Sequence, residues 1–171
     1  MQGYIHVYTG NGKGKTTAAL GVIMRQIGAG NKIFLGQFLK KGNYSEIELL
    51  KLFPEQATVE QYGLGRFVKG KPSEEDIKAA KEGFTRLKDI LKRGEYNLVV
   101  IDEGVIALHF NIVTESDIIN LCDIKADHVE LIITGRGTTK ALIERADLVT
   151  EMVEIKHYYK EGVMARKGIE K

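Results

Sequence analysis

The sequence has one cysteine among its 171 residues, Cys122, which excludes both a disulfide within the chain and a metal site built from four cysteines. Such low cysteine content is typical of a protein that works in a reducing compartment. Cys122 ends the apolar segment 118–122, which predicts a buried thiol rather than a nucleophile. The four histidines lie far apart, without the spacing of metal ligands, so neither a zinc site nor a haem site is predicted.

An excess of charge of either sign is also lacking. Lys and Arg number 25 against 23 Asp and Glu, and the net charge of +2 gives no sign of the basic surface that nucleic-acid-binding proteins carry. The sequence shows no internal repeat, signal peptide or membrane-spanning run. Its 43% hydrophobic content suffices for one well-packed core. We therefore expect a single cytoplasmic domain, residues 1–171, that binds neither nucleic acid nor a membrane.

What the sequence does contain is a glycine-rich loop near its start. The loop follows the apolar run 4–8, which predicts a strand, and consists of Thr9, Gly10, Asn11, Gly12, Lys13, Gly14, Lys15, Thr16 and Thr17. Alternating glycines allow a tight turn whose backbone N–H groups cradle a polyphosphate, while Lys15 supplies a charge and Thr16 a hydroxyl for Mg²⁺. The consensus G-x-x-x-x-G-K-[ST] fails at its first position, where Thr9 replaces glycine. The alternative, a glycine-rich turn capped by lysines, leaves the Lys-Thr-Thr ending unexplained.

Two acidic residues, Asp102 and Glu103, follow the apolar segment 97–101. Continuous apolar character is typical of a parallel strand covered by helices on both faces. In a protein with a phosphate-binding loop, acids at the end of such a strand meet the metal ion bound to the phosphates. The alternative is that one of them only caps the helix that follows. We predict that Thr16, Asp102 and Glu103 hold Mg²⁺ or Mn²⁺.

The remaining segments alternate between strand and helix patterns. Helical spacing of apolar residues, with capping patterns at Ser45 and Ser73, predicts helices, and short apolar runs predict buried strands. The predicted helices cover about residues 17–27, 45–53, 73–93, 114–124 and 139–146, and the later predicted strands cover 33–39, 58–62, 97–103, 129–134 and 148–155. This alternation indicates a three-layer α/β domain, with a mostly parallel sheet of about five or six strands and helices on both faces.

Three further features are candidates for binding. Arg136 follows the strand 129–134, and ligands of open parallel sheets bind outside the carboxyl ends of strands, so it is either a phosphate or substrate contact or a solvated turn arginine. Residues 63–72 suit a substrate-facing loop or an ordinary exposed crossover. His157 lies in the segment 156–171, which mixes aromatic and basic residues without a core pattern.

Taken together, the motifs resemble the ATP:corrinoid adenosyltransferases of the phosphate-loop type. The resemblance covers nearly the whole chain in the family's order, and the threonine at the first position of the loop is similar to that family's own variant. It rests on residues 9–17, 37–40, 100–103, 133–136, 146–152, 156–157, 162–165 and 168–170.

The resemblance implies a RecA-like strand order and a reaction in which the Co(I) centre of a corrinoid attacks the C5′ carbon of ATP and expels triphosphate. Lys15, Glu103 and Arg136 would then be catalytic, the loop 9–17 would bind ATP in the reverse of its usual orientation, and Thr16, Asp102 and Glu103 would organise Mg²⁺. Phe67 and His157 would contact the corrinoid or the nucleotide. A functional C-terminal tail at 156–171, an external reductase for cobalt and a homodimer are also implied.

The sequence departs from the family at two places. The family usually has Gly-x-Gly-Phe-Thr-Trp after the third strand, whereas residues 63–68 read Gly-Leu-Gly-Arg-Phe-Val and the chain has no tryptophan. After Glu103, residues 104–108 read Gly-Val-Ile-Ala-Leu, where the family tends to have Leu and then Asn or Thr. Two other functions therefore stay open from sequence: an ATPase or phosphotransferase, and a non-enzymatic switch that senses ATP.

Overall fold

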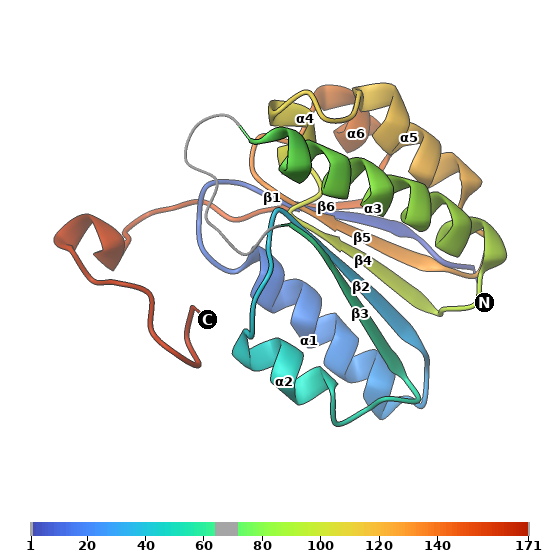
Figure 1. Cartoon of the computed structure of the whole chain (residues 1–171), viewed down its shortest axis with the longest axis horizontal. Coiled ribbons are helices and arrows are strands. Elements are labelled where there is room, and N and C mark those ends of the chain that lie inside the picture. Colours follow the sequence, from blue (N-terminus) through green and yellow to red (C-terminus); the bar gives the residue numbers. More distant parts are fainter. Residues whose placement is uncertain (1, 64–71, 171) are drawn as a thin grey trace.

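A computed structural model of the chain describes residues 2–63 and 72–170. Six parallel strands form one sheet between two layers of helices, which confirms the predicted three-layer α/β fold (Figure 1). The strands are β1 (Ile5–Thr9), β2 (Ile33–Phe38), β3 (Ala57–Tyr62), β4 (Leu98–Asp102), β5 (Glu130–Thr134) and β6 (Leu148–Glu151). The helices are α1 (Lys15–Gly28), α2 (Ser45–Leu50), α3 (Glu74–Arg93), α4 (Ile106–His109), α5 (Glu115–Ile124) and α6 (Lys140–Arg145), followed by the 3₁₀ helix η1 (Tyr158–Glu161).

The strand order across the sheet is β3-β2-β4-β5-β1-β6. Helices α1 and α2 cover one face, and α3, α4, α5 and α6 cover the other (Figure 1). The central strand β4 pairs with β2 and β5, and β5 separates it from β1. Because every strand runs in the same direction, the loops that follow β1, β2, β4, β5 and β6 all leave from one edge of the sheet.

The longest helix, α3, shows how sequence pattern produces this packing. Ser73 and Asp76 form a reciprocal capping box at its start, as the sequence predicts, and Gly94 ends it in the left-handed conformation at φ 63°. One stripe of the helix is buried against the sheet: Ala80, Phe84, Leu87, Ile90 and Leu91. The polar residues on the opposite side face solvent, so the helix is held by its apolar stripe.

Two sequence-based predictions of local structure are wrong. The last strand was predicted to reach residue 155, but β6 ends at Glu151, where the edge strand leaves the side of β1. Ser45 was predicted to cap α2, but it is the first helical residue and Tyr44 occupies the N-cap position. The pattern Ser-x-x-Glu fits a Ser at the N-cap and also a Ser at the first helical position, so the sequence did not distinguish these two positions.

The apolar core lies in two layers, one on each face of the sheet. Phe34, Phe38 and Leu87 are fully buried on the α3 side, and Ile23 and Leu35 are fully buried on the α1 side. Cys122 is 1% exposed in the first layer, which confirms the predicted buried thiol. Within residues 2–63 and 72–170, no helix is both long and apolar enough to cross a bilayer.

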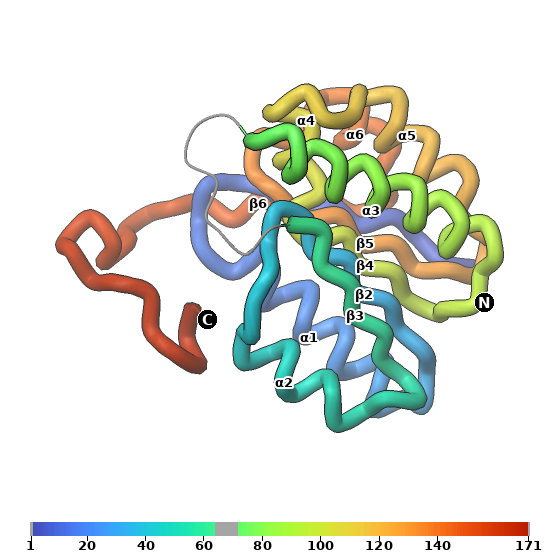
Figure 2. The backbone as a smooth tube through the Cα atoms, viewed as in Figure 1, coloured from blue at the N-terminus to red at the C-terminus, as the bar shows by residue number. Residues whose placement is uncertain are grey.

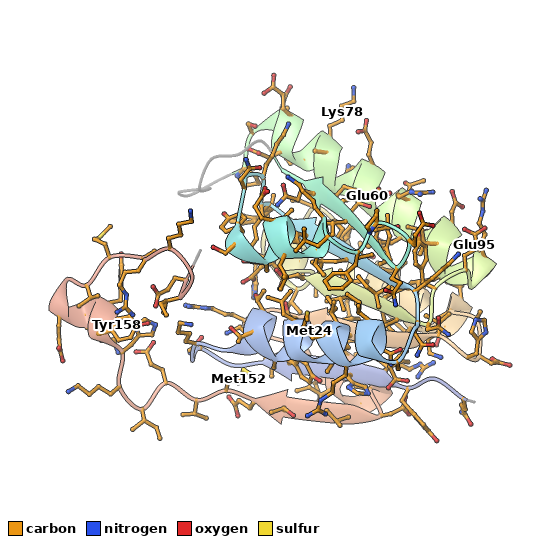
Figure 3. The ribbon with its side chains drawn as sticks, turned by 90° about the horizontal axis from the view of Figure 1, so that it is seen from below. Met24, Glu60, Lys78, Glu95, Met152 and Tyr158 are labelled. Carbon is orange, nitrogen blue, oxygen red and sulfur yellow. The ribbon has the colours of Figure 1, made fainter. Side chains whose placement is uncertain are left out.

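The segment after β6 extends from the body of the molecule and then turns back toward the start of α1 (Figure 2). Tyr158 lies on the projecting part of this tail (Figure 3). The guanidinium of Arg166 lies over the Tyr158 ring in a cation–π contact, with Cζ 5.1 Å from the ring centre. Tyr158 also donates to Oε1 of Glu170, the same oxygen that the Arg166 guanidinium contacts at 3.4 Å. The tail returns to the body where Lys13 Nζ donates to the carbonyl of Ile169 at 3.2 Å.

Candidate functional site

The loop between β1 and α1 leaves the sheet at the edge where the strands end. Gly10 and Gly14 have φ of 95° and 122°, conformations that side-chain-bearing residues rarely adopt. Gly14 is the N-cap of α1, which begins at Lys15. The start of the helix therefore points its free N–H groups and its positive dipole end at the space inside the loop, the arrangement that binds phosphate.

The end of β6 presses closely on this loop. Gly12 N donates to Met152 O at 2.7 Å, and Met152 N donates to Thr9 O at 2.9 Å. A Cβ atom at Gly10 would lie 2.4 Å from Met152 O, and one at Gly12 would lie 2.7 Å from the same oxygen. Glycine is therefore required at both positions, because the backbone of Met152 occupies the space of a side chain.

Lys15 is buried within the loop. Its Nζ donates to the carbonyls of Gly10 at 2.7 Å and Gly12 at 2.8 Å. Burial lowers the pKa of Lys15, as does the nearby charge of Arg136, while Glu103 and Asp102 act in the opposite direction. The loop thus encloses an ammonium group beside the first turn of α1.

Asp102, at the end of β4, is fully buried and accepts four hydrogen bonds. Thr16 Oγ1 and Thr134 Oγ1 each donate to Oδ1 at 2.8 Å. Gln37 Nε2 at 3.1 Å and Lys40 Nζ at 2.8 Å donate to Oδ2. The strand order explains this set, because β2 and β5 flank β4 and bring Gln37 and Thr134 to either side of the carboxylate.

These contacts keep the buried carboxylate ionised. Burial alone would raise the pKa of Asp102, but the charge of Lys40 and the hydrogen bonds from Lys40, Thr134 and Thr16 outweigh it and lower the pKa. Burial likewise opposes the charge on Lys40, yet the pKa of this lysine is raised because Asp102 lies against it. The pair is therefore an ion pair at neutral pH.

Glu103 follows in the left-handed conformation at φ 57°, which is uncommon for a residue with a side chain. Its backbone N–H donates to Thr134 Oγ1 at 2.9 Å. Its carboxylate forms no hydrogen bond or ion pair with the rest of the described chain. Burial and the neighbouring charge of Asp102 raise the pKa of Glu103, while Lys40, Lys15 and Arg136 act against that rise. The strained backbone thus presents a second carboxylate that is still without a partner.

The oxygen donors at this position suit a hard cation such as Mg²⁺ or Mn²⁺ better than a softer metal that prefers nitrogen or sulfur ligands. Residues 2–63 and 72–170 contain no cluster of three His, Cys, Asp or Glu side chains that could hold a metal. The Thr16 hydroxyl and the carboxylates of Asp102 and Glu103 are hard oxygen ligands, and Mg²⁺ is commonly bound by one or two carboxylates together with substrate phosphates. The residues therefore fit a metal that arrives with a polyphosphate.

Other predicted site residues are less closely joined. Arg136 is exposed, and its backbone carbonyl accepts a hydrogen bond from His109 Nε2 at 2.9 Å. The positive charge of Arg136 acts to lower the pKa of both Lys15 and Glu103. His157 is half-buried in the tail, where Nδ1 accepts from Tyr159 N at 3.1 Å. Phe67 lies outside the described residues. The structure therefore gathers the loop with Asp102 and Glu103, but it shows no direct contact from Arg136 or His157 to that cluster.

Four residues around the site were not among the predicted site residues, although three of them lie in the motifs 37–40 and 133–136 that carry the family resemblance. Gln37, Lys40 and Thr134 surround Asp102. Thr138 donates its N–H to Thr9 Oγ1 at 3.4 Å, and its own hydroxyl is buried without a partner in the described structure. The available signal was a polar residue at the carboxyl end of an otherwise apolar strand, which applies to Gln37 and Thr134.

Two grooves on the described surface lie away from this site. One groove of about 240 Å³ lies between α2 and β3 and is lined by Ile47, Leu50, Lys51, Ala57, Val59 and Gln61. Another, of about 610 Å³, follows the outer side of α3. Neither groove is lined by Lys15, Thr16 or Asp102, and the site is identified by its cluster of charges and hydrogen bonds.

Comparison with known proteins agrees with this arrangement. The family described as ATP:corrinoid adenosyltransferase BtuR/CobO/CobP matches residues 1–170. A protein of Pseudomonas aeruginosa named corrinoid adenosyltransferase is 36% identical, over 99% of this chain and 84% of that protein. Proteins of the same name from Escherichia coli K12 and, as corrinoid adenosyltransferase CobA, from Salmonella typhimurium are each 32% identical over 99% of this chain and 86% of their own length.

Proposed function

The chain belongs to the ATP:corrinoid adenosyltransferase family, and on that premise we propose how its own residues act in the transfer of the 5′-deoxyadenosyl group from ATP to a corrinoid. The enzyme is a transferase that uses ATP and a corrinoid as its two substrates, in cobalamin biosynthesis. The observation that carries the proposal is the juxtaposition of the glycine loop, the buried Lys15 and the Thr16–Asp102 contact.

The reaction places a specific demand on the loop. The electron pair of Co(I) forms a bond to C5′ of ATP, the C5′–O bond breaks, and triphosphate leaves with that bonding pair. Negative charge therefore grows on the leaving oxygen, and the protein must stabilise it without transferring a phosphoryl group. Loop N–H groups, the start of α1 and the Lys15 ammonium are suited to this, because they are fixed before the substrate arrives.

We propose that Thr16, Asp102 and Glu103 hold Mg²⁺ or Mn²⁺, which when bound would supply further positive charge at the triphosphate. The Thr16 hydroxyl donates a hydrogen bond to Asp102, so the lone pairs of its oxygen stay available to a cation. Glu103 contributes a carboxylate that forms no hydrogen bond or ion pair with the described residues, and a bound cation would oppose the effects of burial and of Asp102 that raise its pKa.

The remaining assignments are proposals that follow from family membership and position. Arg136 would contact the phosphates, since it follows β5, which pairs with β1 and ends at the same edge of the sheet as the loop. His157 and the tail 156–171 would lie against the nucleotide or the corrinoid, and Phe67 would contact the corrinoid. We also propose that the chain acts as a single domain, forms a homodimer in the cytoplasm, and depends on a separate reductase to supply Co(I).

An anaerobic spectroscopic assay tests this function. The protein is mixed with ATP, Mg²⁺ and chemically reduced cobalamin, and formation of the Co–C bond is followed in the absorption spectrum. We expect adenosylcobalamin to accumulate only when ATP, corrinoid and protein are all present. Orthophosphate release without corrinoid would instead support a phosphotransferase or ATPase, and ATP binding without turnover would support a switch.

A further inference from the structure

The Asp102 carboxylate has no acceptor position left for a metal ion. A carboxylate offers about four lone-pair positions, and this one receives four donors. Thr16 and Thr134 fill Oδ1, while Gln37 and Lys40 fill Oδ2. A cation can therefore bond Asp102 directly only after one donor leaves.

Among the three donors from the β2 and β5 segments, Lys40 is the one that is free to leave, whereas Thr16 is itself a proposed ligand of the cation. Gln37 and Thr134 have no exposed surface and are fixed in strands on either side of β4. The side chain of Lys40 keeps 24% of its surface exposed, and its ammonium ends a flexible four-carbon stem. Among the donors to Asp102 it is also the one with a positive charge, so it occupies the place of a cation electrostatically as well as sterically.

The backbone around Lys40 is built to hold it there. Leu39 has φ of 51°, in the left-handed region that a branched side chain rarely adopts, and its N–H donates to Tyr62 O at 2.9 Å. Gly63 packs against this turn so closely that a Cβ atom would lie 2.7 Å from Lys40 N. Backbone strain of this kind persists where surrounding contacts over-determine it. The turn after β2 therefore places the ammonium of Lys40 against Asp102 at the end of β4.

We propose that Lys40 is an internal counter-cation that closes the metal position in nucleotide-free protein and releases Asp102 when the metal arrives with the triphosphate. The proposal rests on the ATP and metal site proposed above. The Lys40 ammonium neutralises a carboxylate that would otherwise be a buried charge without a counter-charge, which is strongly unfavourable. Phosphate oxygens offer that ammonium a second partner, so the metal enters as its nucleotide complex rather than as the free ion.

The binding of free Mn²⁺ to nucleotide-free protein, measured by electron paramagnetic resonance, tests this directly. We expect Lys40→Met to bind Mn²⁺ at least ~10-fold more tightly than the wild type, since one charge-assisted hydrogen bond typically changes an equilibrium by that order. Lys40→Arg keeps the charge and should bind as weakly as the wild type. Lys41→Met, which removes the exposed neighbouring charge, should also match the wild type.

A double variant separates the proposed contact from a general change in surface charge. Adding Asp102→Asn to Lys40→Met should abolish the gain in Mn²⁺ affinity, because the released carboxylate is then absent. If Lys40→Met does not fold, Lys40→Gln keeps a donor without the charge and should show a smaller gain in the same direction. Unchanged Mn²⁺ affinity in the folded Lys40 variants, or an equal gain in Lys41→Met, overturns the proposal.

The same titration, repeated with ATP, distinguishes failure of this inference from failure of the proposed function. If wild-type protein takes up Mn²⁺ with ATP but Lys40→Met gains no affinity for the free ion, only the role of Lys40 is wrong. If wild-type protein binds no Mn²⁺ even with ATP, the metal site itself is wrong, and the role of Lys40 is overturned with it.

Discussion

Lys15 is a buried ammonium whose hydrogen bonds within the described part of the chain go only to loop carbonyls, so a substitution there should have a clear effect. Substitution Lys15→Ala should weaken ATP binding at least ~10-fold, since hydrogen bonds to charged groups contribute about 1.5–3 kcal/mol. Isothermal titration calorimetry with Mg·ATP measures the effect. Lys78→Ala is the matched control, because Lys78 is exposed on the outer side of α3 (Figure 3). Equal ATP affinity in wild type and Lys15→Ala would remove Lys15 from the phosphate site.

Glu103 allows a prediction about pH. Its pKa is raised above the ordinary value of 4.5, so it favours the folded state only at low pH, and this contribution is lost as pH rises through the raised pKa. In metal-free protein, Glu103→Gln should therefore increase the free energy of unfolding at pH 7.5, by an amount that disappears near pH 4.5. Denaturant unfolding in a chelator at both values measures this. Glu82→Gln, on an exposed position of α3, serves as control.

An unchanged or lower stability of Glu103→Gln at pH 7.5 would mean that the Glu103 carboxylate is already compensated in the metal-free protein. The same variant should bind Mn·ATP more weakly than the wild type, because it loses a negatively charged oxygen ligand. The two effects have opposite signs, which is expected of a residue that serves binding at the expense of stability.

At the level of single residues, the sequence predicted that Thr16 and Asp102 belong to the site, but it did not predict the other residues that donate hydrogen bonds to Asp102. Thr16 is part of the loop motif, and Asp102 lies at the end of an apolar strand. In the structure, Thr16 Oγ1 donates to Asp102 Oδ1 at 2.8 Å. Gln37 and Thr134 reach Asp102 because their strands flank β4, and that information lies in strand order rather than in any local pattern. Lys40 depends in addition on the left-handed Leu39, a conformation that local sequence does not favour.

Among the elements, α3 packs on β3 through a glycine. A Cβ atom at Gly83 would lie 2.4 Å from the ring of Tyr62, so Gly83→Ala should destabilise the protein by about 1–3 kcal/mol despite the higher helix propensity of alanine. Gly21 in α1 has no atom within 4 Å of the same position, and Gly21→Ala should stabilise by about 0.5–1 kcal/mol. Urea unfolding of both variants measures the difference, and stabilisation by Gly83→Ala would contradict the packing described for α3.

Element identity was predictable where pattern and caps agreed. The helix α3 has both a capping box and an apolar stripe, and its observed start at Glu74 follows the predicted cap at Ser73. For the segment after residue 151, alternating apolar residues predicted a continued strand, yet Val153 and Ile155 are 67% and 96% exposed. In the described sheet, β6 is an edge strand that pairs with β1 and ends beside the glycine loop. The alternation of apolar residues did not predict where this edge strand ends.

For the molecule as a whole, sequence predicted the layers and the parallel sheet, because alternating strands and helices have few other arrangements. It did not predict the order of strands from physical rules, since right-handed crossovers are compatible with several orders. That order matters for function, because it places β5 between β1 and β4 and so brings Thr134 to Asp102 beside the loop. The chemistry at this edge is thus a property of the assembled sheet.

In the proposed reaction, the loop stabilises a leaving triphosphate rather than a phosphoryl group in transfer. Phosphorus NMR of the products, after anaerobic turnover with ATP, Mg²⁺ and Co(I) cobalamin, tests it most directly. We expect one triphosphate for each adenosylcobalamin formed, and no phosphorus product when corrinoid is omitted. Release of orthophosphate and ADP at the same rate with or without corrinoid would contradict it.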